Sequence, residues 1–208
     1  MLQQARKHKL TSKEVFSNHN KMADDGTLTK VLTYDIIRKA HRSAGIASVD
    51  MDNCYNQIAH AMASIVFQAF GVTLSATEPM LTTIQEMFGY STDFASSKLE
   101  MKTQGLCQGN SAVPARWAVV SICIINAHKK NGHGAHFICP ITKLKSHIAG
   151  IIYINDTDLI HFKMDEDQLK DETFYCLQEA ITNWGKLLIA SGGASKPVKC
   201  FFHLISFQ

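Results

Sequence analysis

The sequence predicts an α+β fold in which helices pack on one face of an antiparallel sheet. Apolar residues at helical spacing alternate along the chain with short runs rich in β-branched residues. Two such runs, GIIYI at 150–154 and DLIHF at 158–162, are separated by three residues, which predicts a β-hairpin. Strand, helix, hairpin strands, helix and strand follow one another, and this is the order of a βαββαβ core.

The size and composition fit one globular domain. The chain has 208 residues, of which 46% are hydrophobic and 19% charged, so collagen-like, low-complexity and disordered chains are excluded. No apolar run approaches the roughly 20 residues that span a bilayer, and the polar, basic start at 1–13 is not a secretory signal. The six cysteines include no C-x-x-C pair. We therefore expect an intracellular protein, cytoplasmic or nuclear, that is not secreted and has no membrane partner.

The first elements follow a polar segment at 1–27 that has no clear periodicity. From Leu28, apolar residues at helical spacing predict a helix of about fifteen residues, which Gly45 terminates. The run at 46–49 predicts a short buried strand that ends in Asp50. Between Asn53 and Phe70 the apolar positions trace one face of a single long helix.

The rest of the chain supplies further helices and the remaining strands. Pro114 is tolerated at the start of its helix, because the first N–H groups of a helix have no partner within it. Apolar positions from Phe174 to Leu188 form one stripe and predict a long helix. In chain order, the predicted elements are a short helix at 79–88, a hairpin within 89–104, a polar loop at 104–111, a helix at 114–125, a strand at 136–138, the hairpin at 150–162, a helix from 167 to 191 and a closing strand at 200–207.

Two carboxylates stand out by their position. Asp50 ends a predicted strand, and Asp156 lies at the tip of the predicted hairpin. If these strands are neighbours in one sheet, the two side chains converge at its edge and form a site suited to Mg²⁺, which prefers oxygen ligands. A structural interpretation stays open, in which Asp50 caps the following helix and Asp156 is a turn residue. On spacing alone, this structural interpretation is favoured.

Charge and histidine clusters are less informative. With 21 Lys and Arg against 18 Asp and Glu, the net charge of +3 does not indicate a nucleic-acid-binding protein. The basic clusters at 6–13, 129–130 and 143–145 fit a solvated surface or contacts with phosphate. A loose zinc-like spacing is present, but no matched second pair follows it and glycines interrupt it, so a surface loop is favoured. The residues concerned are His128, His133, His136 and Cys139.

Four segments carry a resemblance to reverse transcriptases. VDMDNCYNQI at 49–58, TQGLCQGNSAVP at 103–114 and YINDTDLI at 153–160 resemble three successive motifs of the polymerase palm. The segment from Asn183 to Cys200 and the strand after it resemble the fourth motif. The likeness runs from about Leu28 to Phe207, and it is strongest to retrotransposon-derived domains whose catalytic hairpin reads Y-[VI]-D-D-T-D-L-I. It implies a ferredoxin-like palm at 46–208, preceded by a partial fingers segment at 1–45.

The resemblance implies an RNA-directed DNA polymerase, which transfers nucleotides to a primer 3′-end with Mg²⁺. Its partners would be an RNA or DNA template with a primer, and dNTPs. The implied catalytic residues are Asp50, Asn155, Asp156 and Lys199; the implied Mg²⁺ ligands are Asp50 and Asp156; and the implied nucleotide-binding residues are Tyr55, Gln108, Gly109 and Tyr153.

Several of these residues have distinct implied roles. Tyr55 matches the bulky aromatic residue that blocks a ribose 2′-hydroxyl and so selects deoxynucleotides. Gln108 and Gly109 match the pair that lines the incoming nucleotide. Lys199 matches a cation that meets the triphosphate charge or protonates pyrophosphate.

The sequence also departs from the pattern of active members. Asn155 stands where they have the first Asp of the hairpin, and an amide keeps a carbonyl oxygen but loses the negative charge. This loss corresponds to a rate reduction of roughly a hundred-fold to ten-thousand-fold, and Asp158 on the returning strand is a poor substitute. Val113 replaces a helix-capping Ser, and Asn56 replaces an Asp that is not a metal ligand. We therefore expect this copy to be inactive or severely impaired.

Two other functions remain open. One is a retroelement remnant that acts at most as a nucleic-acid-binding module, and the other is a zinc- or protein-binding module unrelated to polymerases. The positions of the motifs in the chain are relevant to the retroelement remnant. Only 49 residues precede Asp50 and nine follow Lys199, so we expect neither complete fingers nor a thumb in this chain.

Overall fold

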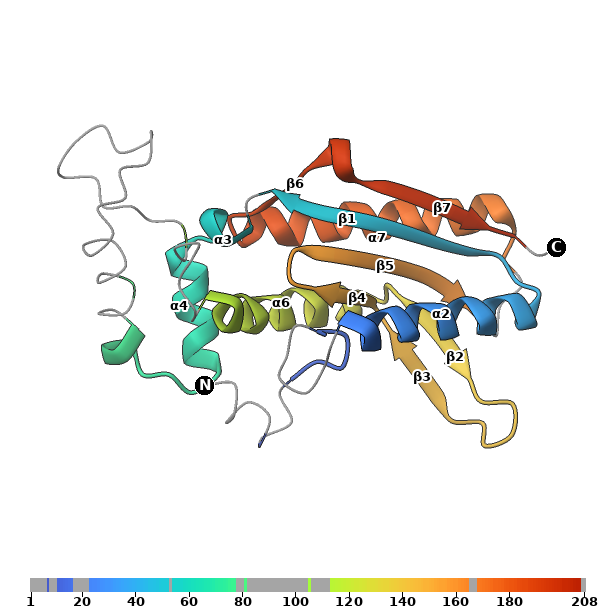
Figure 1. Ribbon diagram of the computed structural model, residues 1–208, viewed down its shortest axis with the longest axis horizontal. Helices are drawn as coiled ribbons and strands as arrows, with labels where there is room; N and C mark the ends of the chain where they lie inside the picture. The colour runs from blue at the N-terminus through green and yellow to red at the C-terminus, as the bar shows by residue number, and fades with distance from the viewer. Residues whose placement is uncertain are drawn as a thin grey trace.

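The computed structural model describes residues 7, 11–16, 23–52, 54–77, 81, 105, 113–164 and 168–206 (Figure 1). In the described part, no helix is both long and apolar enough to cross a membrane. The described elements are α2 (Ala23–Ala40), β1 (Ala44–Asp52), α3 (Cys54–Gln57), α4 (His60–Ala69), α6 (Val113–Lys130), β2 (Ala135–Ile138), β3 (Lys145–Ile148), β4 (Gly150–Tyr153), β5 (Asp156–Lys163), α7 (Lys170–Ala190), β6 (Ala194–Ser195), the 3₁₀ turn η1 (Pro197–Lys199) and β7 (Phe201–Ile205).

The centre of the fold is an antiparallel sheet in the order β7–β1–β5–β4. The helix α6 precedes β4 and the helix α7 precedes β7, so the predicted βαββαβ order of elements is present, with the β2–β3 hairpin inserted after α6. Short pairings of β2 with β5, β3 with β2 and β6 with β1 extend the sheet to seven strands, and among the described strands the β2–β5 pair alone is parallel. The chain therefore has the predicted α+β class with a mostly antiparallel sheet.

Both faces of the sheet are covered, which corrects the prediction that the helices pack on one face. Residues Ala47, Val49 and Met51 of β1 join α6 and α7 in the larger apolar cluster. Alternate residues such as Ile46 join Ile37 of α2 in a second cluster on the opposite face. The physical reason lies in β5, where the larger cluster contains Leu159 and the second contains the next residue, Ile160. A strand that is apolar on both faces needs a helix on each side.

The helix predicted over 53–70 is in fact two helices. The break between α3 and α4 falls at Ile58 and Ala59, where the Ala59 N–H donates to the Ser191 carbonyl at 3.0 Å. The Ile58 side chain is fully buried at this break. The chain after α7 passes so close to the end of α3 that a Cβ on Gly192 would lie 2.5 Å from the Gln57 carbonyl oxygen. This tertiary contact replaces the helical hydrogen bonds that the apolar spacing had predicted.

The other differences are smaller. The strand predicted at 136–138 is β2, but its partner β3 was not predicted, because Lys145 and Ser146 are exposed and give no apolar alternation. The elements predicted at 79–88, 89–104 and 104–111 lie outside the described residues, apart from Leu81 and Gly105. β1, the β4–β5 hairpin, α6, α7 and β7 confirm the predictions made for those segments.

Candidate active site

Asp50 and Asp156 face each other across two neighbouring strands. The antiparallel register of β1 and β5 places Asp50 opposite Asp156, so both side chains lie on the same face of the sheet. Asp50 lies inside β1, which continues to Asp52, and Asp156 is the first residue of β5 and not a turn residue. The structural interpretation, a helix cap and a turn residue, is therefore wrong. The predicted convergence of the two carboxylates at one end of the sheet is present.

A side chain of α6 makes a hydrogen bond to the turn between β4 and β5. It consists of Ile154 and Asn155, and Ile154 has a φ of 56°, which β-branched residues rarely adopt. The indole N–H of Trp117, a buried residue of α6, donates to the Ile154 carbonyl. Trp117 thus fixes the backbone next to Asn155. Sequence reasoning missed this residue, and an indole in the helix after the second motif was the available signal.

Both carboxylate oxygens of Asp50 have partners within the chain. The Asn155 amide nitrogen donates to Oδ1 at 3.0 Å, and the Lys199 ammonium lies 3.0 Å from Oδ2. The Asp50 side chain is only 12% exposed, so these contacts take the place of water. The hydrogen bond from Lys199 to Asp50, together with the attraction between their charges, raises the pKa of Lys199. Three of the predicted catalytic residues therefore form one hydrogen-bonded group.

Backbone contacts hold Lys199 in this position. The N–H of Lys196, just before η1, donates to the Asp50 carbonyl at 2.9 Å, and the Lys199 N–H donates to the Lys196 carbonyl at the same distance. The short strand β6 pairs with Met51 and Asp52 immediately before this turn. The fourth motif is thereby attached to the strand that carries the first.

The Asp156 side chain differs from that of Asp50 in having no hydrogen bond or ion pair to any residue that the structure describes. Its side chain is exposed at the start of β5. Partial burial and then the negative charges of Asp50 and Asp158 raise the pKa of Asp156, and Lys199 opposes this effect. Among the described residues, therefore, nothing occupies the coordinating oxygens of Asp156.

Two further lysines form ion pairs with carboxylates of β1 and β5, and the sequence analysis did not single them out. Lys30 of α2 lies 2.8 Å from Asp158, and Lys196 lies 3.7 Å from Asp52. Burial lowers the pKa of Lys30, but the hydrogen bond and the charge of Asp158 outweigh it and the pKa is raised. Lys30 could have been found from its place on the side of α2 that also carries Gly26 and Thr33, which are buried.

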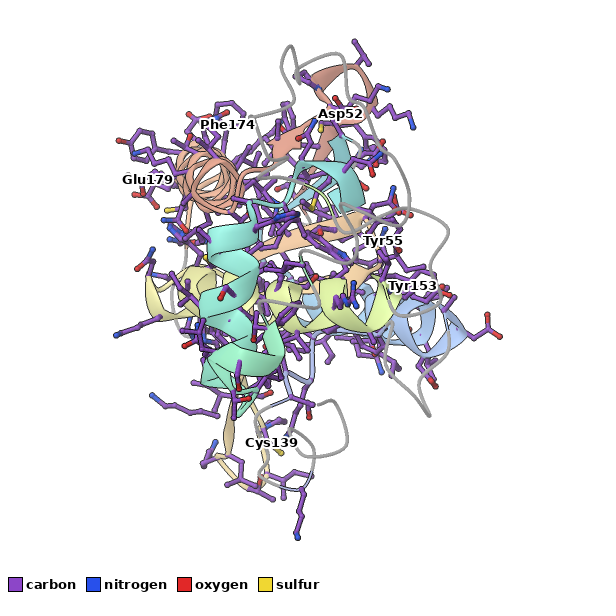
Figure 2. All side chains as sticks on the ribbon, turned by 90° about the vertical axis from the view of Figure 1, so that its left-hand side faces the viewer. Asp52, Tyr55, Cys139, Tyr153, Phe174 and Glu179 are labelled. Atoms are coloured by element: carbon purple, nitrogen blue, oxygen red, sulfur yellow. The ribbon has the colours of Figure 1, made fainter. Side chains whose placement is uncertain are left out.

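The predicted nucleotide-binding residues are only partly described. Tyr55 of α3 is half-buried and packs against the larger apolar cluster, and Tyr153 is exposed opposite Asp156 in the β4–β5 register. Figure 2 looks at this end of the molecule, with Asp52, Tyr55 and Tyr153 on one side of the view and α7 on the other. Gln108 and Gly109 lie outside the described residues.

Gly105 is the one residue within 103–112 of the second motif that the structure describes. The Gly105 N–H donates to the Ile58 carbonyl at 2.9 Å, and the Gly105 carbonyl lies 2.7 Å from Nε2 of His60. Gly105 has a φ of 97°, which suits glycine at such a close approach. Gly105 of the second motif therefore lies beside the break between α3 and α4, and this break begins at Ile58, three residues after Tyr55.

The carboxylates at this end of the sheet fit a hard divalent cation in part. Asp50 and Asp156 offer oxygens from adjacent strands, and the raised pKa of Asp156 reflects negative charge that a cation would balance. Within the described ranges, however, no group of three or more His, Cys, Asp or Glu side chains could hold a metal ion. Asn155 presents its N–H to Asp50 where a third carboxylate would complete such a group. The donor set therefore suits one cation better than two.

The histidine cluster gives no support to the zinc interpretation. The rings of His128 and His133 stack with centroids 4.9 Å apart, and those of His136 and His147 stack at 4.0 Å. Stacked rings present their faces to each other and do not point their nitrogens at a common centre.

The similarity to known proteins lies in the structure. No protein-family model matches the sequence, and no curated protein is similar to it in sequence. Among solved structures, apo telomerase from Candida tropicalis, truncated from its C-terminal domain, is 13% identical with a TM-score of 0.59 over 98% of this chain and 38% of that one. Telomerase from Candida albicans in complex with a telomeric RNA fragment is 11% identical, with a TM-score of 0.57 over 97% of this chain and 33% of that one. The chain thus spans about a third of the length of these telomerase chains, and its fold is similar to that part of them.

Proposed function

We propose that this chain is the palm of a retrotransposon-derived RNA-directed DNA polymerase, and that Asn155 leaves it severely impaired. Its ancestral reaction is nucleotidyl transfer to a primer 3′-end, templated by RNA or DNA. The observation that carries the proposal is the Asp50–Asp156 pair on β1 and β5, with the turn containing Asn155 beside it and Lys199 on Asp50. These four residues come from three segments with palm-like motifs, and Asn155 and Asp156 share one of them.

Two further findings support this assignment. The order of strands and helices is the βαββαβ order that the motifs implied, and the structural neighbours are telomerases. A nucleic-acid partner agrees with the telomeric RNA fragment that the Candida albicans telomerase structure contains.

Mg²⁺ is the cofactor that this reaction requires, and Asp50 and Asp156 are the residues that would hold it. Bound there, it would favour ionisation of the primer 3′-hydroxyl and neutralise charge on the departing pyrophosphate. The protein residues supply position and charge. Lys199 is well exposed, so its ammonium group can leave Asp50 and meet a triphosphate. Tyr55, which lies on α3 beyond the end of β1, would exclude a ribose 2′-hydroxyl.

Asn155 impairs this site in two ways. It brings no negative charge, and its N–H group donates to the Asp50 oxygen that a cation would need. With Lys199 on the other oxygen, Asp50 is neutralised by the chain itself. A cation has to displace both contacts before it reaches Asp50, which weakens its binding.

Primer extension tests the proposal. A labelled DNA primer annealed to an RNA template is incubated with dNTPs and Mg²⁺, and the chain is compared with Asn155→Asp and with Asp50→Ala in the Asn155→Asp background. We expect little or no extension by the chain, a gain of about a hundred-fold or more in Asn155→Asp, and loss of that gain in the double variant. Robust extension by the unaltered chain would show that the impairment is wrong. No extension by Asn155→Asp would contradict the polymerase assignment for this chain.

The internal neutralisation of Asp50 also favours a second candidate function, a retroelement remnant that binds nucleic acid without catalysis. Binding of a labelled RNA–DNA duplex, measured by anisotropy once in EDTA and once in Mg²⁺, separates the two. A remnant binds equally well with and without Mg²⁺, and Asp50→Ala does not weaken its binding. A polymerase site binds the duplex with dNTP more tightly when Mg²⁺ is present, and Asp50→Ala removes that difference.

A further inference from the structure

The helix α2 has two opposite apolar sides, and only one of them is buried in the fold. Gly26, Thr33 and Ile37 pack toward the sheet. The other side carries four large apolar residues that are 41–57% exposed, namely Leu28, Val31, Leu32 and Ile36. Leu28 and Ile37 are nine residues apart, about two and a half helical turns, so they lie on opposite sides of the helix.

This exposed stripe is unusual for a helix on a protein surface. Leu28, Leu32 and Ile36 follow one another at intervals of four residues, so they form a continuous row. Single exposed apolar residues need no explanation, but a contiguous row on one helix marks an interaction surface. A helix that is apolar on both sides is normally covered on both sides.

The charges at the two ends of the stripe indicate what covers it. Asp24 and Asp25 lie in the first turn of α2, and Arg38 and Lys39 lie in the last turn. Asp25 and Lys39 are each seven residues from Leu32, while Leu28 and Ile36 are each four residues from it. The pattern is therefore apolar and symmetric about Leu32 but opposite in charge at its two ends.

We propose that α2 is a homodimer contact, in which the α2 helices of two copies of this chain pair antiparallel about a two-fold axis near Leu32. In this arrangement Leu32 meets Leu32 of the other copy, and Leu28 meets Ile36. Asp25 of each copy lies level with Lys39 of the other, so two pairs of opposite charges close the ends of the contact. The antiparallel helix dipoles also attract each other.

Other occupants match the surface less well. A parallel pair of α2 helices would place Asp24 and Asp25 against the same residues of the other copy. An unrelated apolar partner would cover the stripe but would make no use of the opposite charges at equal distances from Leu32. One helix pair buries less than the roughly 1,200–2,000 Å² of a standard interface, so the dimer should be weak and depend on protein concentration.

Sedimentation of the complete chain between about 1 and 300 μM tests the proposal, because weak dimers of this size dissociate in the micromolar range. We expect the mass to rise from that of the monomer toward that of the dimer. Leu32→Glu should keep the protein monomeric throughout. Ile189→Glu is the matched control, because Ile189 is an equally apolar residue on α7 that is 72% exposed, and it should dimerise like the unaltered chain.

A charge exchange tests the antiparallel geometry independently of the apolar stripe. Lys39→Glu and Asp25→Lys should each weaken dimerisation about tenfold, and the double variant should recover most of that loss. Circular dichroism confirms that each variant is folded. A monomer at all concentrations, an unchanged dimer in Leu32→Glu, or a double variant weaker than both single variants would each overturn the proposal. Covering of the stripe by a different protein would give the first of these results.

Discussion

One amide group decides the chemistry of the candidate site. Asn155 occupies a turn position that Trp117 fixes through the Ile154 carbonyl, so its side chain is held close to Asp50. A carboxylate at the same place would repel Asp50 and Asp156, and only a cation would make that arrangement favourable. In the present chain the Asn155 amide and the Lys199 ammonium bind the two carboxylate oxygens of Asp50 instead.

Asn155→Asp should therefore make stability depend on Mg²⁺. We expect the variant to be less stable than the unaltered chain in EDTA, and to gain about 3 °C in melting temperature when 10 mM Mg²⁺ replaces EDTA. The unaltered chain should show a smaller gain. Asn155→Ala is the control, because it removes the hydrogen bond to Asp50 without adding a charge. Equal gains in all three proteins would show that Asp50 and Asp156 are not a cation site.

The two tryptophans of the chain offer a matched comparison of the turn contact. Both are 2% exposed, but the Trp117 N–H donates to the Ile154 carbonyl, whereas the Trp184 N–H has no hydrogen-bond partner in the described structure. Trp→Phe at either position removes ring volume, and only at Trp117 does it also leave a carbonyl without its donor. We expect Trp117→Phe to lose about 1–2 kcal/mol more unfolding free energy than Trp184→Phe in urea titrations. Equal losses would mean that the indole hydrogen bond does not stabilise the turn.

At the scale of elements, the junction of α3, α4 and the end of α7 positions the site. Gly192 packs against the backbone of Gln57 and Ala59, and the Ala59 N–H is bound by Ser191. This contact breaks the helix after Tyr55, and it directs the chain into β6 and η1, which carry Lys199. One close backbone approach therefore sets the relative position of the first and fourth motifs.

Gly192→Ala should disrupt this junction. Gly192 has a φ of 92°, and an added Cβ would lie 2.5 Å from the Gln57 carbonyl oxygen. We expect a loss of at least about 2 kcal/mol in unfolding free energy. Gly185→Ala is the control: this glycine lies inside α7 with nothing within 4 Å of an added Cβ, so alanine should stabilise the helix by about 0.5–1 kcal/mol. Similar effects at both positions would contradict the close approach.

At the scale of the whole molecule, histidines link stability to pH. His128 of α6 is fully buried against α7, where its Nδ1 lies 3.0 Å from the Asn183 side-chain oxygen. Burial lowers the pKa of His128 from 6.5 to about 4, and burial likewise lowers the pKa values of His133, His147 and His161. These residues come from α6, β3, β5 and the loop between α6 and β2, so their protonation affects the contact between sheet and helices.

Acid should therefore destabilise the fold. Above pH 6.5, His128 is neutral in both the folded and the unfolded chain, and its burial carries no protonation cost. Between pH 6.5 and about 4 only the unfolded chain binds the proton, so stability falls by about 3 kcal/mol from this residue alone. Urea titrations at pH 7, 6, 5 and 4 measure the fall. His128→Gln cannot titrate and should show a shallower decline, so parallel curves for the two proteins would rule out His128 as the cause.

Local sequence patterns were sufficient to predict the elements whose signals lie in adjacent residues. The β4–β5 hairpin, α6 and α7 follow from alternation, turn residues and apolar stripes. Such patterns arise because the apolar side chains of one element lie on the face that is buried. The motif positions also predicted that Asp50 and Asp156 would meet. The short β3 and the break at Ile58 were not predictable in this way, because an exposed strand has no apolar alternation and a break made by Gly192 involves a residue far along the chain.

The tertiary structure settled the features that depend on which elements meet. It placed α2 on the second face of the sheet, brought Lys30 to Asp158, and gave both oxygens of Asp50 to Asn155 and Lys199. The contacts of Lys30 and Asp50 depend on distances of a few ångströms between residues that are about 100 positions or more apart in sequence. The position of α2 depends on which face of the sheet the other helices leave exposed. Patterns within one segment carry no such information, because a side chain's partner is determined by the packing of the whole sheet.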